Sequence, residues 1–521
     1  VLAVFRKLEK MQPAKLKKMY PAMPDKMSVK PFAGIDFNDL NDDQKQLLRE
    51  WNYANFRRTK IIKSRDSVIM SRQSSLRQAG EFVDWSSKFS SDVIYFPHDV
   101  DYRIRLYNMC MTGLNTQGAD FEKSLLMFAN GRQIKTENGL KWMRINMANL
   151  MGKDKLELAD RVQYAIDNEA LIERVANDPL NNTEWYEWDK PMQGLAAAFD
   201  YTKWLNDKDS YLNIHGQLDG LCNGIQNLAA LTRDHNVAPH VGLIKTKERG
   251  DVYQLVCDEA DRTMGAGYLQ DEIRKAMILC RGLTKPPVMT RSYGAALHGI
   301  KSGCQDYILD NGYKDSFTDV FATGNWLGSH IWDAMENTLP GPMAFMQWIQ
   351  DVAKVFGKND LPMKWTNPAG SVCVQTKNET KVKVVRYKCD RTEREYTFKT
   401  PTGKMNTRKM VSSSSPNVIH SCDGSHLIGT ANLCVDDGIV DFAFVHDSFG
   451  AHFDDCETLL DNTKQAWVDQ YSYDWITHWL IEFKQQLVQN DIKDVIPDPS
   501  SYMTMGKLDV NDVKESDFFF A

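Results

Sequence analysis

The stretch Phe444-Val445-His446-Asp447-Ser448-Phe449-Gly450 decides the fold of this chain, because it places a carboxylate at the tip of a tight turn. The apolar segments on either side of it, residues 440–445 and 451–453, are expected to be strands. An aspartate in a turn is a weak indication when it stands alone, since its side chain bonds readily to the local backbone. A second turn of the same kind makes the indication specific.

That second turn is Leu218-Asp219-Gly220-Leu221-Cys222-Asn223-Gly224-Ile225-Gln226, at the end of an expected strand over residues 211–218. Beyond Asp219 the apolar period changes to that of a helix, so this carboxylate lies at a strand-to-helix junction between rigid elements. Two aspartates on neighbouring strand ends can hold two magnesium ions roughly 3.5–4 Å apart, which is the geometry of in-line nucleotidyl transfer.

The chain resembles the single-subunit RNA polymerases of podophages and mitochondria in five motifs that occur in the same order. The two aspartate motifs of that family match residues 219–226 and 446–450. The family's fingers motif, Arg-x-x-x-Lys followed eight residues after the lysine by Tyr-Gly, matches Arg281, Lys285, Tyr293 and Gly294. The other two matches are residues 420–427, His-Ser-Cys-Asp-Gly-Ser-His-Leu, and the carboxy-terminal residues 515–521.

The resemblance implies an α/β (α+β) fold with the right-hand architecture of palm, fingers and thumb, mostly helical around a small antiparallel palm sheet. The implied domains are a thumb at 1–90, a first part of the palm at 91–235 with an insertion at about 131–205, the fingers at 236–419, and a second part of the palm with a carboxy-terminal foot at 420–521. Within the thumb, the capping box Asn41-Asp42-Asp43-Gln44 opens a long helical stretch, and two basic helices are expected in this region.

The resemblance also implies the activity of a DNA-directed RNA polymerase, a nucleotidyltransferase that adds ribonucleotides to an RNA 3′-hydroxyl by a two-metal mechanism. Two Mg²⁺ ions would be held by Asp219, the Gly220 carbonyl and Asp447, and the implied catalytic residues are Asp219, Asp447, Lys285 and Tyr293. The residues implied to bind the incoming nucleotide are Arg105, Lys155, Arg281, Tyr293, Gly294 and His420. For Lys155, an ordinary surface lysine is an equal alternative.

Arg105 belongs to the segment 101–107, whose alternation of residues predicts a strand. The family has Asp-Trp-Arg-Gly-Arg here, so Tyr102 and Ile104 are departures from its pattern, whereas Arg103 and Arg105 are retained.

The fingers motif also has a physical interpretation of its own. Thr284 is a good N-cap and Pro286 is tolerated in a first turn, so a helix is predicted to begin at Lys285. The helix dipole and Lys285 would then face an anion, with Tyr293 two turns further along. Phosphate at one end and sugar or base at the other is an arrangement that suits a nucleoside triphosphate.

A strongly basic segment, residues 371–410, holds eleven Lys or Arg against four acids. Within it, residues 381–389 and 394–399 alternate as two strands do, which predicts a hairpin, and the serines 412–415 that follow are expected to form a flexible joint. In the family a hairpin at this position enters the promoter major groove, and the residues implied to contact DNA are Lys381, Lys383, Arg386, Lys388, Arg391 and Arg394. A hairpin that touches only phosphate is the alternative.

The overall charge of the 521-residue chain is −6, but the charge is segregated. Residues 1–30 hold eight basic residues against two acids, and residues 431–470 hold nine acids against one lysine. Basic arms and an acidic metal centre suit an enzyme that grips phosphates. No run of 18 apolar residues predicts a membrane span, and the ten scattered cysteines lack the Cys-x-x-Cys spacing of a zinc ribbon.

The partners implied are double-stranded promoter DNA, the template strand, the nascent RNA and NTPs, with the chain acting as a monomer. The chain begins where the family's thumb begins, so an amino-terminal region or a partner chain is expected in addition. The expected location is the host cytoplasm for a phage enzyme, which compactness favours, or the mitochondrial matrix for an organellar one.

Two alternatives stay open at this point. Family A DNA polymerases share the palm and the fingers motif but usually have Asp-Tyr-Ser and His-Asp-Glu at the metal sites. This chain has Asp219-Gly220 and His446-Asp447-Ser448, which favours RNA synthesis. A non-catalytic DNA-binding subunit that kept the fold would be marked by the loss of a metal aspartate, and both aspartates are present.

Overall fold

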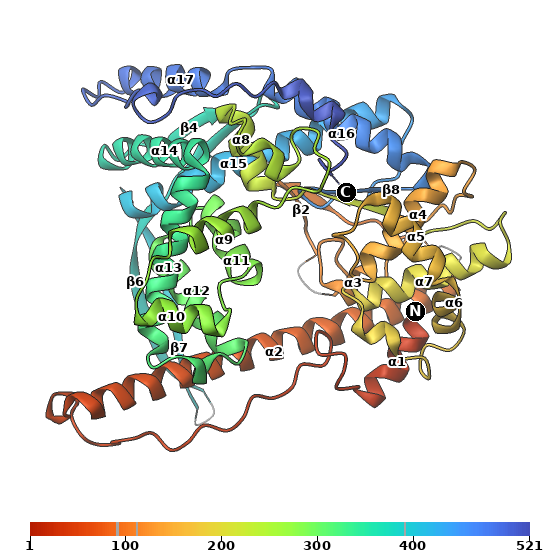
Figure 1. The fold of residues 1–521 in the computed structure, drawn as a ribbon, viewed down its shortest axis with the longest axis horizontal. Helices are drawn as coiled ribbons and strands as arrows, with labels where there is room; N and C mark the ends of the chain where they lie inside the picture. The colour runs from red at the N-terminus through yellow and green to blue at the C-terminus, as the bar shows by residue number, and fades with distance from the viewer. Residues whose placement is uncertain (90–92, 111–112, 390–391, 521) are drawn as a thin grey trace. The chain divides into compact units, whose positions relative to one another are not determined.

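The fold is described by a computed structural model, in which residues 1–89, 93–110, 113–389 and 392–520 are described. These residues are mostly helical, with small two-stranded sheets, as predicted (Figure 1). The chain divides into two compact units, and each is described by itself. The first unit comprises Val1–Asp99, Tyr107–Gly216 and His452–Asp454, and the second comprises Val100–Leu106, Gln217–Ala451 and Asp455–Ala521.

The first unit is built from helices around a core rich in tryptophan and small side chains. Its helices are α1 (Leu2–Met11), α2 (Asp42–Phe89), α3 (Asp120–Lys123), α4 (Glu137–Leu150), α5 (Leu158–Asp167), α6 (Glu169–Asn177) and α7 (Pro191–Asn206). Helix α7 begins at Pro191, a residue that suits the first helical position, and its alanines are buried with Trp142 and Trp185. Loop residues 152–157, which include Lys155, precede α5.

Helix α2 differs from the prediction of two basic helices, because residues 42–89 form a single helix of 48 residues. It starts as predicted at the capping box, where the Asn41 side chain accepts from the Gln44 N–H at 2.9 Å and the Gln44 side chain accepts from the Asn41 N–H at 3.0 Å. The helix continues unbroken because residues 42–89 contain no proline and a single glycine, Gly80.

An extended strap, residues 19–28, is hydrogen-bonded along α2 (Figure 1). The donors are side chains of α2 spaced seven residues apart, which therefore share one face of the helix, and the acceptors are backbone carbonyl oxygens of the strap. These donors are Trp51 to Ser28, Arg58 to Asp25, Arg65 to Pro21 and Arg72 to Met19. Three arginines that look like phosphate ligands in the sequence therefore have a structural role, and Arg72 is buried against Glu9 at 3.0 Å.

The second unit carries the two aspartate motifs and the fingers motif, and ten of the helices of the described residues. Its helices are α8 (Asn223–Thr232), α9 (Val252–Thr263), α10 (Tyr268–Ala276), α11 (Arg281–Ser292), α12 (Leu297–Asp310), α13 (Val320–Thr338), α14 (Pro340–Lys358), α15 (Thr407–Asp436), α16 (Cys456–Tyr471) and α17 (Trp475–Gln489). Helix α15 is the central member, since α8, α14 and α16 all pack against it.

Helix α15 corrects the prediction of a flexible joint at residues 412–415, because these serines lie inside it. Ser414 and Ser415 are fully buried. The Ser413 hydroxyl donates to the Lys409 carbonyl at 2.7 Å, and the Ser414 hydroxyl donates to the Val411 carbonyl at 2.8 Å. Serine hydroxyls that bond back to the preceding turn lower the cost of burying them in a helix.

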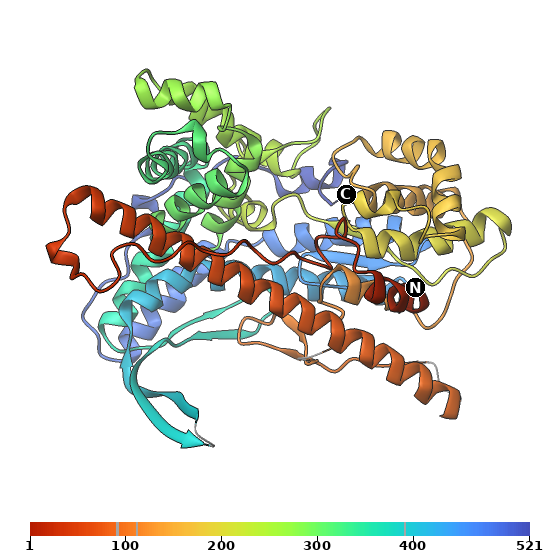
Figure 2. The same cartoon turned by 90° about the horizontal axis from the view of Figure 1, so that it is seen from below.

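The strands form separate two-stranded sheets in the described part of the chain. The pairs are β1 (His98–Val100) with β2 (Leu106–Asn108), β3 (Gly216–Asp219) with β8 (Ser448–Ala451), β4 (Met363–Thr366) with β5 (Val372–Gln375), and β6 (Asn378–Cys389) with β7 (Thr392–Met405). The predicted hairpin is confirmed as β6–β7, which is antiparallel and longer than expected. Figure 2 shows it extending away from the helices of its unit.

An aromatic cluster at the carboxy terminus supports the β3–β8 sheet. Phe519 and Phe520 are fully buried, and the Phe520 ring lies 5.4 Å from that of Phe449 in β8. The Phe520 backbone bridges to Gly220, directly after β3. His426 of α15 contacts both phenylalanines, and burial lowers its pKa to about 4, so it is a neutral member of this core. In the described residues, no helix has the length and apolar character needed to cross a membrane.

Candidate active site

The two predicted metal aspartates lie at the ends of paired strands. Asp219 is the last residue of β3, and Asp447 lies in the turn directly before β8. That turn consists of the two residues between Val445 and Ser448. The Val445 N–H donates to the Ser448 carbonyl at 2.8 Å, and the Ser448 N–H donates to the Val445 carbonyl at 3.0 Å. His446 has a φ of 56°, the left-handed conformation that a two-residue hairpin loop needs.

The strands around these aspartates are shorter than the sequence predicts. Residues 440–444 are not part of a strand. Strand β8 begins at Ser448 and ends at Ala451, so only the first residue of the predicted strand over 451–453 lies in it. Likewise, β3 is four residues long, whereas Leu212 pairs with Arg132 in an isolated bridge. The apolar runs predicted full strands here, but their residues are largely half-buried or exposed, with Val440 67% and Tyr211 59% exposed, so burial does not favour an extended sheet along their whole length.

The electrostatics of the turn suit a cation. Burial raises the pKa of Asp447, and the negative charge of Asp219 raises it further, while Arg105 opposes the shift. A buried carboxylate next to a second negative charge gains from a divalent cation beside it, and oxygen ligands are those that magnesium prefers. The donor set therefore fits the predicted metal site, with the Gly220 backbone held next to Asp219 by the bridge to Phe520.

Arg105 is held beside this site by a carboxylate that the sequence did not single out. Its Nε donates to Asp423 Oδ1 at 2.9 Å, and a second ion-pair contact joins its Nη2 to Oδ2. Asn223, at the start of α8, donates to Asp423 Oδ2 at 3.1 Å. Burial raises the pKa of Asp423 to about 6, against the opposing effect of Arg105. The carboxylate is thus ionised at neutral pH and paired.

Arg105 comes from a turn, and the predicted strand over residues 101–107 is wrong. Residues 101–105 connect β1 to β2, and the Asp101 side chain accepts from the N–H groups of Arg103 and Arg105 at 2.8 and 3.2 Å. An aspartate that accepts from the backbone two residues ahead favours a turn over a strand. Ile104 has a φ of 58°, and its carbonyl oxygen would lie 3.0 Å from a Cβ at Gly424 in α15.

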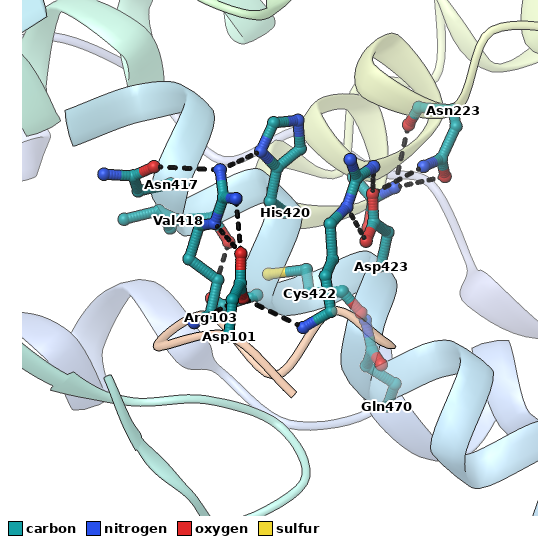
Figure 3. Close-up of polar contacts among 12 residues, drawn as sticks. Asp101, Arg103, Asn223, Asn417, Val418, His420, Cys422, Asp423 and Gln470 are labelled. Atoms are coloured by element: carbon teal, nitrogen blue, oxygen red, sulfur yellow. Dashed lines mark hydrogen bonds and ion pairs between the residues drawn. The ribbon is translucent and has the colours of Figure 1, made fainter. Parts of the chain in front are cut away.

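His420 is a neutral acceptor in this network. Figure 3 shows Arg103 between Asp101 and His420, with its Nη1 donating to His420 Nδ1 at 3.0 Å. Because arginine can only donate, Nδ1 accepts and the ring proton lies on Nε2. Burial lowers the pKa of His420 to about 2, and the positive charges of Arg105 and Arg103 lower it further.

The ring of Tyr293 lies next to this histidine at an interplanar angle of 37°. Their ring centroids are 4.9 Å apart, and burial together with the charges of Asp447 and Asp423 raises the pKa of the Tyr293 hydroxyl. Gly294 follows with a φ of 82°, and a Cβ there would lie 2.9 Å from the Ser412 carbonyl oxygen. Glycine is therefore required after Tyr293 by the close approach of the end of α11 to α15.

Helix α11 starts one turn earlier than predicted. It begins at Arg281 with Cys280 as N-cap residue, so Lys285 lies in its second turn and both Pro286 and Pro287 lie inside the helix. The Thr284 hydroxyl, predicted to cap the helix, instead donates to the Tyr253 carbonyl of α9 at 2.9 Å. The tertiary contact with α9 outweighs the local capping preference.

Lys285 lies close to the Asp219 loop. The thiol of Cys222, three residues after Asp219, has its pKa raised by burial and by Asp447 and lowered by the positive charge of Lys285. Asp219, Asp447, Lys285, Tyr293, Arg105 and His420 thus belong to the second unit, around α8, α11 and α15. Lys155 belongs to the first unit, and its role stays a prediction.

The hairpin carries the predicted DNA-contacting residues away from this site. Lys381, Lys383 and Arg386 are exposed on β6, and Arg386 pairs with Glu395 at 2.9 Å. Arg391 lies outside the described residues, and the side chains of Lys388 and Arg394 also lie outside them.

Sequence reasoning missed Asp423, Asn223, Asp251 and Tyr253 as members of the site. Asp423 stands three residues after His420 in a helix, a spacing that places two polar side chains on one face. That spacing is the local indication that could have identified it. Asp251 and Tyr253 belong to no recognised motif, and only their contacts with Arg281 in the structure identify them as members of the site.

Asp219 and Asp447 thus lie at adjoining strand ends, and α11 of the same unit carries Arg281 and Lys285 and ends at Tyr293. The family model for DNA-dependent RNA polymerase matches residues 133–504, and the chain belongs to this family.

Individual relatives agree with the family match. The chain is 27% identical to the DNA-directed RNA polymerase of Enterobacteria phage T3, over 92% of this chain and 58% of the relative. It is 27% identical to the T7 RNA polymerase of Escherichia phage T7, over 100% of this chain and 62% of that protein. It is also 29% identical to the mitochondrial DNA-directed RNA polymerase 1B of Nicotiana tabacum, over 82% and 43% respectively. The chain thus spans about two fifths to three fifths of the length of these relatives.

Proposed function

We propose that this chain carries the catalytic centre of a DNA-directed RNA polymerase, which transfers ribonucleoside monophosphates from NTPs to the 3′-hydroxyl of a transcript. The observation that carries the proposal is the placement of Asp219 and Asp447 at paired strand ends, with mutual electrostatic repulsion that a divalent cation would relieve. In this proposal Asp219, the Gly220 carbonyl and Asp447 hold two Mg²⁺ ions. Such ions supply activation of the attacking hydroxyl and neutralisation of the leaving pyrophosphate.

The chain's own residues hold and check the incoming nucleotide. Arg281 and Lys285 bind its phosphates from the first two turns of α11, and Lys155 is proposed as a further phosphate ligand. Tyr293, Gly294 and His420 face the sugar and base, where a neutral His420 can donate through Nε2 to an acceptor on the substrate. Arg105, kept in place by Asp423, contacts the nucleotide or the hybrid.

The palm, fingers and thumb follow from the same proposal. The proposed ranges are a thumb at 1–90, a palm at 91–235 with an insertion at about 131–205 and at 420–521 with the foot, and fingers at 236–419. Within the thumb, the strap occupies Arg58, Arg65 and Arg72, so phosphate contacts fall to the exposed side chains of Arg49, Lys60, Lys63 and Arg77. Lys60 and Lys63 lie roughly 140–160° around the helix axis from Arg58 and Arg65, at about 100° per residue.

The hairpin is proposed to contact promoter DNA, and its register gives it two different faces. Opposed residues of an antiparallel pair share a face, and the pairs Lys383–Phe398 and Val385–Tyr396 define an aromatic one. Tyr387 joins it, since its ring stacks 5.4 Å from that of Tyr396. Arg386 and Glu395 lie on the opposite face. Exposed aromatics between lysines suit contact with bases as well as with phosphate.

The remaining partners are the template strand, the nascent RNA and NTPs, and the chain is proposed to act as a monomer in the host cytoplasm of a phage infection.

Extension of an RNA primer on a preassembled RNA–DNA scaffold tests the activity. The chain should add NTPs in preference to dNTPs, and Asp219→Asn and Asp447→Asn should each abolish addition while scaffold binding stays within about twofold. Asp469→Asn is the matched control, because Asp469 is an exposed acid of the same acidic segment. Preference for dNTPs would indicate a DNA polymerase instead, and extension by either site variant would overturn the metal assignment.

A further inference from the structure

The amino-terminal end of α9 contacts the cationic helix α11 through one carboxylate. Asp251 is the N-cap of α9, and its Oδ1 accepts from the N–H groups of Tyr253 and Gln254 at 3.0 and 3.1 Å. Its other oxygen, Oδ2, is paired with Nε of Arg281, the first residue of α11. One carboxylate therefore fixes the start of both helices.

Tyr253, two residues further on, contacts both phosphate-binding cations. The centroid of its ring lies 5.2 Å from Cζ of Arg281 and 5.7 Å from Nζ of Lys285. These distances fall within the range of cation–π attraction, and the ring is buried, which strengthens it. A tyrosine between two like charges lowers the cost of holding them close together.

The same tyrosine is tied to the loop that follows the first aspartate. Its hydroxyl donates to the Leu221 carbonyl, two residues after Asp219, at 3.4 Å. Its own carbonyl accepts from the Thr284 hydroxyl, next to Lys285, at 2.9 Å. Backbone and side chain of one residue thus link the Asp219 loop to α11.

We propose that Asp251 and Tyr253 are positioning residues that set Arg281 and Lys285 at a fixed place relative to the Asp219 loop, so that the nucleotide's phosphates meet both cations at once. This inference rests on the proposed function and adds two residues to it. Asp251 accepts from Arg281 at Nε, and the guanidinium carries further N–H donors on its terminal nitrogens that can bind phosphate oxygens. Long cationic side chains that are already ordered lose less freedom when they bind.

The variant Asp251→Asn separates this role from helix capping. Asparagine caps helices as well as aspartate does, so the variant should fold normally but lose the charge that orients Arg281. We expect KM for all four NTPs to rise by about tenfold, with scaffold affinity, melting temperature and discrimination against dNTPs unchanged. KM for pyrophosphate in the reverse reaction should rise in parallel, because the lost contact is to phosphate.

Asp319→Asn is the matched control. Asp319 caps α13 in the same way, accepting from Phe321 and Ala322 N–H groups at 2.8 and 3.0 Å, and among the described residues it forms no ion pair with Lys or Arg. Its KM values should stay unchanged. A KM rise of equal size in both variants would show a capping effect and overturn the proposal, as would unchanged KM in Asp251→Asn.

Tyr253 is tested by two variants with different losses. Tyr253→Phe keeps the ring and should raise KM slightly, whereas Tyr253→Leu removes the ring and should raise KM by about tenfold. Equal KM values for these two variants would show that the ring has no role.

Direct binding distinguishes failure of this inference from failure of the proposed function. Inorganic tripolyphosphate is used as the probe, with the full chain and no scaffold. If the unsubstituted chain extends no primer, the proposed function falls, yet weaker tripolyphosphate binding by Asp251→Asn than by Asp319→Asn still supports this inference. Equal binding by the two variants would overturn it.

Discussion

Two arginine–carboxylate pairs in the second unit have the same chemistry and opposite surroundings. In the candidate active site, the side chains of Arg105 and Asp423 are 12% and 2% exposed. In the hairpin, those of Arg386 and Glu395 are 68% and 51% exposed. The first pair has been taken out of water and is held by Asn223 as well, whereas the second is screened by solvent.

This difference indicates that the candidate active site is preorganised and that the hairpin is not. In the site, charges are fixed before any substrate arrives, so the removal of one group leaves its partner buried and unpaired. In the hairpin, Lys381, Lys383 and Arg386 are exposed, and the ion pair of Arg386 with Glu395 is open to solvent. We therefore expect single substitutions to have large effects at the site, whereas the hairpin should respond mainly to removal as a whole.

Removal of the hairpin should give the largest effect on promoter use. Replacing residues 381–399 by a short glycine linker should abolish preference for promoter over non-promoter DNA, because base contacts specify sequence while phosphate contacts elsewhere position the duplex. Elongation on a preassembled scaffold should remain within about twofold of the original rate, since the hairpin extends away from the helices of its unit (Figure 2). Run-off transcription from matched templates measures both.

The outcome that would break the comparison is retained promoter preference after this deletion. Loss of elongation on the scaffold would also contradict the comparison, because it would show that the site depends on the hairpin for its activity.

Removal of a single carboxylate should destabilise the site far more than the hairpin. Asp423→Ala should lower the free energy of unfolding by roughly 3 kcal/mol, because Arg105 is left buried without its counter-charge. Glu395→Ala should change it by less than about 1 kcal/mol, as is usual for exposed pairs. Urea unfolding followed by tryptophan fluorescence compares the two, and equal losses would mean that burial does not decide the effect.

Tyr293→Phe should have a smaller, selective effect. Loss of the buried hydroxyl should reduce the preference for NTP over dNTP by about tenfold while kcat for NTP stays within about twofold, since a site built around a hydroxyl rejects analogues that lack one. Competition between NTP and dNTP on the scaffold measures this. The matched hairpin variant, Tyr396→Phe, should leave the preference unchanged.

The sequence predicted those parts of the structure that depend on neighbours in the chain. The alternation of β6 and β7 and the capping box at Asn41 are local patterns, and both are confirmed. The placement of Asp447 in a two-residue turn is likewise a local property. Family membership followed from motifs that need no three-dimensional information.

The parts that failed depend on distant contacts. Asp423 lies 318 residues from Arg105 in sequence, so no local pattern could pair them. The start of α11 was placed at Lys285 because Thr284 is a good cap, but its hydroxyl bonds to Tyr253 in another helix. The arginines of α2 looked alike in the sequence, and the strap that occupies three of them could not be inferred from their spacing alone.

Backbone conformation gives the smallest contrast between the two regions. The hairpin has glycine at its left-handed position, Gly403 with a φ of 82°, whereas the turn of the site has Ile104 with a φ of 58°. The left-handed conformation costs a residue with a β-carbon roughly 1–2 kcal/mol, and branching at that carbon makes it rarer still. The surrounding contacts hold Ile104 there, since its N–H donates to the Asp101 carbonyl at 2.8 Å.

A pair of substitutions at Ile104 tests whether this strain is real. Ile104→Gly and Ile104→Ala both remove the isoleucine packing, but the alanine variant keeps the β-carbon. We therefore expect the glycine variant to be more stable than the alanine variant by roughly 1 kcal/mol, although glycine is usually the less stabilising of the two because it loses more backbone freedom on folding. Gly403→Ala in the hairpin should lose a similar amount for the same reason. Urea unfolding measures the site pair, and protection of hairpin amides from hydrogen exchange measures Gly403→Ala. If the alanine variant at position 104 were the more stable, the turn would have relaxed away from the left-handed conformation, and Arg105 would no longer be held by the backbone that precedes it.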